Sequence, residues 1–306
     1  MKAGENAGLD LNRFPPPGRA FFGRLSPKGN DAALGVDIGG LEFSLIGLDP
    51  SSRERLREKY AAFPAGGSAP FVVQVLDGER EHFVPPREVA PGAPHPLSLA
   101  WEGPLLLVQS FGFAGWISIE TGEGAMALAR SEFERITWCV ENFLRVCTAW
   151  RAVREGGVLL HAASLALEGK AYVFLGASGS GKSTLAASSR KGVVISDDLT
   201  LVRPGEPGFR VVGTPFRGTY QGGPPVRCSF PLAGLYRIFQ SPDNRVEPCP
   251  QNHAVPDLLA AAPFVVDQLA RGDKIFSTLK ALDASHPLAY LHFDRSGDFW
   301  RALNPG

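Results

Sequence analysis

The sequence predicts an α/β domain in the C-terminal part of the chain, preceded by a smaller, β-rich α+β domain. Short apolar runs between Gly and Pro clusters fill residues 33–130, which is typical of strands. The apolar spacing changes to three and four residues after residue 131, which is typical of a helix. Further on, a strand-like run leads directly into a glycine-rich segment and a helix-like one. We therefore expect three parts: a flexible segment, 1–32, a β-rich domain, 33–130, and an α/β domain, 131–306.

Length and composition exclude several classes of protein. The chain has 306 residues, which is enough for roughly two domains. Hydrophobic residues make up 44% and charged residues 20%, so a disordered chain is excluded as the default. Lys plus Arg and Asp plus Glu both number 31, and the net charge is zero. We therefore expect no nucleic-acid partner and no membrane partner, and any anion site must be local.

Cysteines and the N-terminal residues indicate a compartment. The four cysteines show no Cys-x-x-Cys spacing, so we interpret them as reduced thiols. The first residues lack the apolar region of a leader peptide, and no apolar run approaches the roughly 18 residues of a membrane span. These features predict a cytoplasmic protein.

Specific elements follow from the local patterns. Residues 34–48 predict two strands joined at Gly39-Gly40, and residues 51–63 predict a helix with a solvated Arg/Glu face. A long amphipathic helix is predicted over 131–154, with Cys139 and Cys147 on its buried stripe as core residues rather than metal ligands. Further strands are predicted at 71–76, 105–108, 116–119, 158–167, 171–175 and 288–293, and a helical region at 256–282 with breaks at Pro263 and 271–273.

A glycine-rich motif lies at the centre of the α/β domain. Residues 176–183 match G-x-x-x-x-G-K-[ST] in full and are followed by Thr184. The matching residues are Gly176, Ala177, Ser178, Gly179, Ser180, Gly181, Lys182 and Ser183. An apolar run, 173–175, precedes the motif and a helix-like segment follows it, which is the context that the motif requires. The pattern predicts a site for a nucleoside triphosphate.

Each residue type in the motif has a role in holding phosphate. Gly176, Gly179 and Gly181 leave no Cβ between backbone N–H groups and a phosphate. The helix that begins at Lys182 points free N–H groups at the β-phosphate, and the Lys182 ammonium reaches the β and γ oxygens. Ser183 supplies a hydroxyl ligand for Mg²⁺.

Two aspartates follow the motif after a short gap. Asp197 and Asp198 end the apolar run 193–195, and Asp197 lies 14 residues after Ser183. Only a short helix and a turn fit in this gap, so we expect the pair at the carboxyl end of a strand adjacent to the loop's own strand, facing the γ-phosphate. One carboxylate can bind Mg²⁺, with Ser183 and Asp197 as candidate ligands, and the other can take the proton of an attacking hydroxyl. Whether both carboxylates converge on the site stays open, and a plain Asp-Asp turn is the alternative.

His161 precedes the motif by 15 residues, on a strand predicted to form a hairpin with the loop's strand. A buried core histidine is the common alternative on sequence alone. The hairpin brings His161 near the phosphates, where an imidazolium could bind a γ oxygen or pair with Asp197 or Asp198.

His161, the glycine-rich loop and the Asp197-Asp198 pair, in that order, resemble the catalytic domain of bacterial HPr kinase/phosphorylase. The related ATP-dependent phosphoenolpyruvate carboxykinases share this order, and the resemblance covers about residues 150–300. It implies a P-loop domain with ATP as donor, in which Lys182 binds phosphate and Ser183 binds metal. One aspartate of the pair would act as base and His161 would assist.

A second segment extends the resemblance. Residues 224–227, Pro-Pro-Val-Arg, are similar to the family's flexible arginine-bearing loop, and a strand at 232–239 follows as it does there. Arg227 would then stabilise charge on the transferring phosphoryl group. The family's Glu-Ile-Arg-Gly signature is half present, because 215–218 reads Pro-Phe-Arg-Gly, with Pro215 where the acid belongs. This departure removes the basis for expecting a second metal ligand or the reverse, phosphorolytic activity.

These features predict an ATP-dependent kinase, similar to the HPr serine kinases, that phosphorylates a Ser or other hydroxyl of a peptide, protein or small molecule. The alternative is an ATP-binding regulatory module with little catalysis, controlled by a partner. A carboxykinase is disfavoured because those enzymes are longer, and an ABC-type ATPase because its second acidic motif lies far downstream of the loop. The resemblance also implies a homo-oligomer.

Overall fold

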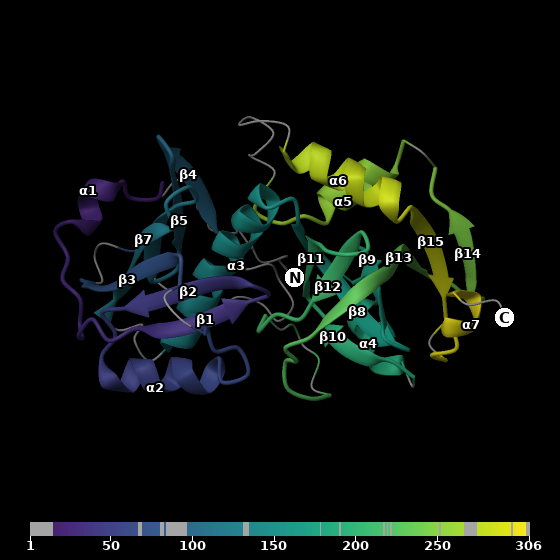
Figure 1. Cartoon of the computed structure of the whole chain (residues 1–306), viewed down its shortest axis with the longest axis horizontal. Helices are drawn as coiled ribbons and strands as arrows, with labels where there is room; N and C mark the ends of the chain where they lie inside the picture. The colour runs from purple at the N-terminus through teal and green to yellow at the C-terminus, as the bar shows by residue number, and fades with distance from the viewer. Residues whose placement is uncertain are drawn as a thin grey trace, which may run out of the picture. The chain divides into compact units, whose positions relative to one another are not determined.

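The computed structural model describes residues 15–66, 69–79, 83, 97–130, 135–177, 179–189, 191–216, 218, 220, 222–250, 252–265, 274–294 and 296–303. The chain is mixed α/β and divides into two compact units (Figure 1). The first contains Met1–Val36, Glu42–Lys59 and Ala65–Leu144, and the second contains Asp37–Leu41, Tyr60–Pro64 and Arg145–Gly306. The boundary between the two units falls after Leu144, inside a helix. From the sequence we expected the boundary before that helix, at residue 130.

The first unit is built on one seven-stranded sheet with the order β1-β2-β3-β7-β6-β5-β4. Its strands are β1 (Leu34–Ile38), β2 (Leu41–Ile46), β3 (Phe71–Gly78), β4 (Ser98–Glu102), β5 (Leu105–Ser110), β6 (Phe113–Ser118) and β7 (Glu123–Ala129), and its short helices are α1 (Arg19–Phe22) and α2 (Pro50–Lys59). All the strands that the sequence predicts here are confirmed, as is the helix, although α2 ends at Lys59 rather than at residue 63. β4 and β7 were not predicted, and residues 1–14 of the expected flexible segment lie outside the described residues.

Helix α3 (Ile136–Arg154) confirms the predicted amphipathic helix, whose first residues, 131–134, lie outside the described ones. Cys139 and Cys147 are buried on it as free thiols, as expected. Burial raises the pKa of the Cys147 thiol, so this residue is an unreactive core side chain. Within the described residues, no helix combines the length and the apolarity that crossing a bilayer requires.

The second unit contains a closed ring of five strands. β8 pairs with β11, β11 with β12, β12 with β13, β13 with β9, and β9 again with β8. The strands are β8 (Val158–Leu167), β9 (Lys170–Leu175), β10 (Val193–Ser196), β11 (Leu199–Pro204), β12 (Phe209–Val212), β13 (Ser229–Gln240), β14 (Arg245–Pro248) and β15 (Leu288–Phe293), and the helices are α4 (Lys182–Ser188), α5 (Ala254–Ala260), α6 (Lys274–Ser285) and α7 (Trp300–Leu303). β10 pairs with β8 outside the ring, and β15 and β14 extend it from β13.

Most predicted elements of this unit are confirmed. The strands at 158–167, 171–175, 232–239 and 288–293 are present, and the helical region 256–282 is divided into α5 and α6, with Pro263 between them. The predicted break at 271–273 lies outside the described residues. β11, β12 and β14 were not predicted.

The expected neighbour of the loop's strand was wrong. β10, which ends at the aspartate pair, pairs with β8 and not with β9. Because β8 and β9 form a hairpin, β8 occupies the position beside β9 that β10 was expected to take. β9 and β10 are both antiparallel to β8, so they run in the same direction and their carboxyl ends lie at the same edge.

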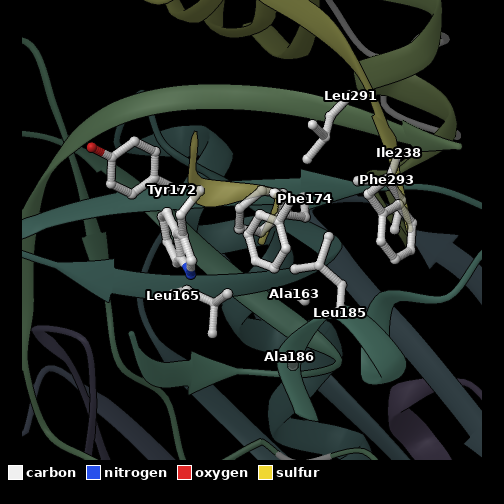
Figure 2. Packing of buried hydrophobic residues seen from close by; sticks show 11 residues of the cluster. Ala163, Leu165, Tyr172, Phe174, Leu185, Ala186, Ile238, Leu291 and Phe293 are labelled. Carbon is white, nitrogen blue, oxygen red and sulfur yellow. The ribbon is translucent and has the colours of Figure 1, made fainter. Parts of the chain in front are cut away.

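An aromatic core fixes α4 against β9. Phe174 is fully buried, stacks on Tyr236 with ring centroids 5.8 Å apart, and meets the edges of Phe299 and Trp300. Leu185 and Ala186 of α4 belong to the same cluster (Figure 2). The two elements that flank the glycine-rich loop are therefore held by one core.

Candidate functional site

The glycine-rich loop connects the end of β9, at Leu175, to the start of α4, at Lys182. Gly181 has φ of 101°, and a Cβ there would lie 3.0 Å from both Gln240 Nε2 and Phe293 Cζ. Only glycine combines this left-handed conformation with so close an approach. Ser178, one of the motif residues, lies outside the described residues.

The Lys182 side chain is folded back into the loop. Its ammonium donates hydrogen bonds to the carbonyl oxygens of Gly176, at 2.8 Å, and Ala177, at 3.1 Å, and the residue is only 6% exposed. Burial lowers the pKa of Lys182, and the negative charge of Asp198 acts against this shift. The ammonium is therefore positioned inside the loop and within the electrostatic reach of Asp198.

Hydroxyl groups lie on either side of Lys182. Ser183 and Thr184 are exposed in the first turn of α4. The Ser180 hydroxyl oxygen is buried and has no hydrogen-bond partner among the described residues. An unpaired buried donor is costly, so this hydroxyl favours a ligand oxygen in the loop.

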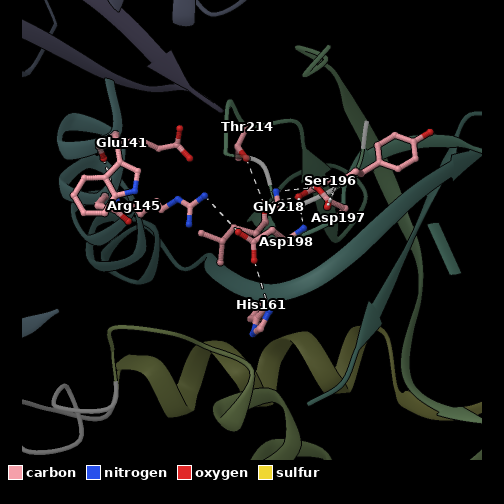
Figure 3. A network of polar contacts seen from close by, with 12 residues as sticks. Glu141, Arg145, His161, Ser196, Asp197, Asp198, Thr214 and Gly218 are labelled. Carbon is pink, nitrogen blue, oxygen red and sulfur yellow. Dashed lines mark hydrogen bonds and ion pairs between the residues drawn. The ribbon is translucent and has the colours of Figure 1, made fainter. Parts of the chain in front are cut away.

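The two adjacent aspartates face different partners. Asp197 is 5% exposed, and its carboxylate oxygens accept hydrogen bonds from the backbone N–H of Gly218, at 3.0 Å, and of Tyr220, at 2.8 Å. The Asp198 carboxylate lies 3.6 Å from His161 Nε2 and 3.4 Å from the Arg145 guanidinium (Figure 3). The question that the sequence left open is thus answered: the two carboxylates diverge, and Asp198 is the one that contacts His161 and Arg145.

His161 is positioned by strand pairing. On β8 it is opposite Leu199, the residue after Asp198, while its neighbour Ala162 is opposite Leu175, the residue before the loop. The predicted hairpin is therefore confirmed. Burial is the main cause that lowers the pKa of His161, the positive charges of Lys182 and Arg145 lower it further, and Asp198 raises it.

Arg145 is a member of this cluster that the sequence did not reveal. It lies on α3 with its guanidinium 5.7 Å from the centre of the Phe216 ring and beside Asp198. The apolar stripe of the helix runs through Phe143 and Cys147, and Arg145 lies on the opposite side, so the apolar pattern gave no reason to expect it in a site. We refer to Arg145, His161, Lys182 and Asp198 as the Asp198 cluster.

Arg227 is not brought to the Asp198 cluster. Its guanidinium pairs with the Asp37 carboxylate and donates to the carbonyl of Pro64 at 3.4 Å. It lines a cavity together with Arg203 and Arg210. The role expected for Arg227 at a transferring phosphoryl group therefore has no support from this arrangement, and Arg217 of the half-present signature lies outside the described residues.

No protein-family model matches the sequence, and no curated protein matches it. The likeness to HPr kinase/phosphorylase thus rests on the order of His161, the glycine-rich loop and the aspartate pair.

Proposed function

We propose that the chain is an ATP-dependent phosphotransferase that moves the γ-phosphoryl group to a hydroxyl of a peptide, protein or small molecule. The observation that carries this proposal is the position of Asp198. It contacts His161 and Arg145 at the edge where β9 leads into the glycine-rich loop, and its negative charge acts on Lys182. A glycine-rich loop alone holds phosphate. A carboxylate at the same edge of the sheet as that loop adds the group that transfer to a hydroxyl requires.

The proposed reaction assigns a role to each member of the Asp198 cluster. The acceptor oxygen forms a bond to the γ-phosphorus while the bond to the β–γ bridging oxygen breaks and ADP leaves. The acceptor's proton passes to Asp198, the carboxylate that contacts His161 and Arg145. Lys182 offsets negative charge on the phosphate oxygens, and Arg145 and His161 hold the carboxylate in position.

The residues present also fit a magnesium nucleotide. The Ser183 hydroxyl and a carboxylate of the aspartate pair would hold Mg²⁺, which supplies charge neutralisation at the phosphate oxygens. Asp197 would be the carboxylate ligand, because each of its oxygens accepts one backbone N–H and keeps a further lone pair, while Asp198 keeps the role of base. No group of three or more His, Cys, Asp or Glu among the described residues could hold a metal alone, so phosphate oxygens and water would complete the coordination.

Two substitutions test the proposal. Lys182→Ala and Asp198→Asn should each lower transfer of label from γ-labelled ATP, onto acceptors in a cell extract, by at least about 10²-fold. Lys280→Ala and Asp298→Asn, at exposed positions outside the cluster, are the matched controls and should leave transfer unchanged. Transfer at the wild-type rate in both cluster variants would overturn the proposal.

A regulatory ATP-binding module is the second candidate. Two observations favour it: Arg227 pairs with Asp37 rather than facing the loop, and Pro215 stands where the related kinases carry an acid. Tight ATP binding, with no ADP released in the presence of any acceptor mixture, would select the module over the kinase.

A further inference from the structure

A cavity of about 530 Å³ lies in the second unit, away from the Asp198 cluster. Arg203, Arg210 and Arg227 line it, together with Asp37, Cys228 and Ser229. Arg203 is four residues along β11 from Leu199, which corresponds to about 13 Å of extended strand. The cavity is therefore separate from the nucleotide site proposed above, and its size is that of a small-molecule site.

The charges at this cavity do not balance. Asp37 pairs with Arg227, and Glu155 pairs with Arg203. The guanidinium of Arg210 donates to the hydroxyl and carbonyl oxygens of Ser229, both at 2.8 Å, and no carboxylate of the described residues lies within ion-pair distance of it. Arginine stays protonated in proteins, so one positive charge at the cavity lacks a counter-charge.

The walls of the cavity also offer neutral polar groups. The Ser229 hydroxyl accepts from Arg210 and keeps its own proton as a donor. Cys228 is half-buried beside it, and burial raises the pKa of its thiol, so the thiol adds no negative charge near neutral pH. A guanidinium and a hydroxyl on adjacent strands form a donor set suited to the oxygens of a carboxylate or a phosphate.

We propose that this cavity binds a small organic anion through a carboxylate or phosphate group held by Arg210 and its neighbouring arginines. The ligand need not be a nucleotide, because the proposed nucleotide loop is a different part of the second unit. Anion binding in this cavity does not depend on phosphoryl transfer, so a binding measurement alone can test it.

Alkylation of the wild-type protein tests the proposal without a substitution. Cys228 lines the cavity, whereas Cys249 is also half-buried but lies outside it. Burial raises the pKa of both thiols, so Cys249 serves as an internal control. Iodoacetamide labelling is followed by peptide mass spectrometry in the presence of citrate, glycerol 2-phosphate or uncharged glycerol.

We expect one of the two anions, or both, to slow the labelling of Cys228 at least threefold while the rate at Cys249 stays the same. Protection by citrate alone identifies a carboxylate ligand, and protection by glycerol 2-phosphate alone identifies a phosphate ligand. Unchanged labelling of Cys228 with both anions, or equal slowing of both cysteines, would overturn the proposal.

Calorimetric titration of the protective anion then assigns the site. Arg210→Gln should weaken binding at least tenfold, while Arg301→Gln, which removes one exposed positive charge elsewhere, should keep the Kd within twofold. Lys182→Ala should also keep it within twofold. Loss of binding in Lys182→Ala would place the anion in the glycine-rich loop and contradict the proposal.

Discussion

Asp197 and Asp198 are adjacent in the sequence and have the same chemistry, but the fold gives them different surroundings. Asp197 accepts two backbone N–H groups, and Asp198 faces a guanidinium and an imidazole. Because side chains at the end of a strand still point in opposite directions, one carboxylate anchors the chain and the other contacts Arg145 and His161. At the residue scale, this division of roles is what makes Asp198 the candidate base.

His161 reports on the charges around Asp198. We expect its pKa to lie below the usual value of 6.5, because burial, Lys182 and Arg145 all disfavour the imidazolium. Lys182→Ala should raise this pKa by removing a positive charge, and Asp198→Asn should lower it further by removing a negative one. Titration of the histidine ring signals by NMR, with His161→Gln for assignment, measures both shifts.

The lowered pKa of His161 also determines how the stability of the protein changes with pH. The folded state holds the His161 proton less tightly than the unfolded state does, so the unfolded state gains protons first as the pH falls. The stabilisation from neutral His161 is complete above about pH 6.5 and is lost as the pH falls toward the folded-state pKa. If neither substitution moves the His161 titration, the cluster is not assembled as described.

At the scale of elements, hydrogen bonds fix four described residues between β12 and β13. The N–H of Gly213 donates to the carbonyl of Cys228 at 2.9 Å, and Gly218 and Tyr220 donate to Asp197. A Cβ at Gly218 would lie 2.6 Å from an Asp197 carboxylate oxygen, which is too close for any larger residue without displacement. Gly218 and Tyr220 are therefore held against the end of β10 by one carboxylate.

Removing that carboxylate should loosen the attachment of Gly218 and Tyr220. Hydrogen bonds to charged groups contribute about 1.5–3 kcal/mol each, and these two are partly solvated, so Asp197→Ala should lower the free energy of unfolding by about 2–3 kcal/mol. Asp197→Asn keeps one acceptor oxygen, so it should lower the free energy of unfolding by a smaller amount. Urea denaturation measures the unfolding free energy of both variants, with Asp298→Ala as the control at an exposed position. If Asp197→Ala lowers this free energy no more than Asp298→Ala does, the anchoring role is contradicted.

The core beneath the loop makes a second prediction at this scale. Phe174 is fully buried among aromatic rings and the residues of α4, so Phe174→Ala should cost about 3–5 kcal/mol of unfolding free energy. Val193→Ala, at a side chain that is 59% exposed, should change it by no more than about 0.5 kcal/mol. Chemical denaturation compares the two variants, and similar values would show that the cluster does not hold β9 and α4 together.

The same elements show what could be read from the sequence. β8 and β9 are apolar along most of their length and are buried, so their runs of Val, Leu and Ala predicted them. β14 is exposed at every position, and β12 has only four residues, so neither carries an apolar pattern that distinguishes it from a loop. β14 forms because it pairs with β15, and β12 forms because it pairs with β13. Such pairing depends on the tertiary structure and not on the local sequence.

For the molecule as a whole, the Asp198 cluster draws on four separate parts of the chain: α3, β8, the glycine-rich loop and the end of β10. The loop and the aspartates were predictable because short motifs with fixed chemistry mark them. Arg145 was not predictable, because it lies off the apolar stripe of its helix and belongs to no motif. The position of Arg227 was not predictable either, because it depends on tertiary contacts with Asp37 and Pro64.

The central claim is that a bound γ-phosphoryl group lies beside the Asp198 cluster, and the titration of His161 in the presence of nucleotide tests it most directly. A γ-phosphate adds negative charge near the imidazole, so ATP should raise the pKa of His161, ADP should raise it less, and neither should do so in Lys182→Ala. This measurement does not require the acceptor to be known. If ATP binds and the pKa of His161 stays where it was, the γ-phosphate is not at the cluster and the account is wrong.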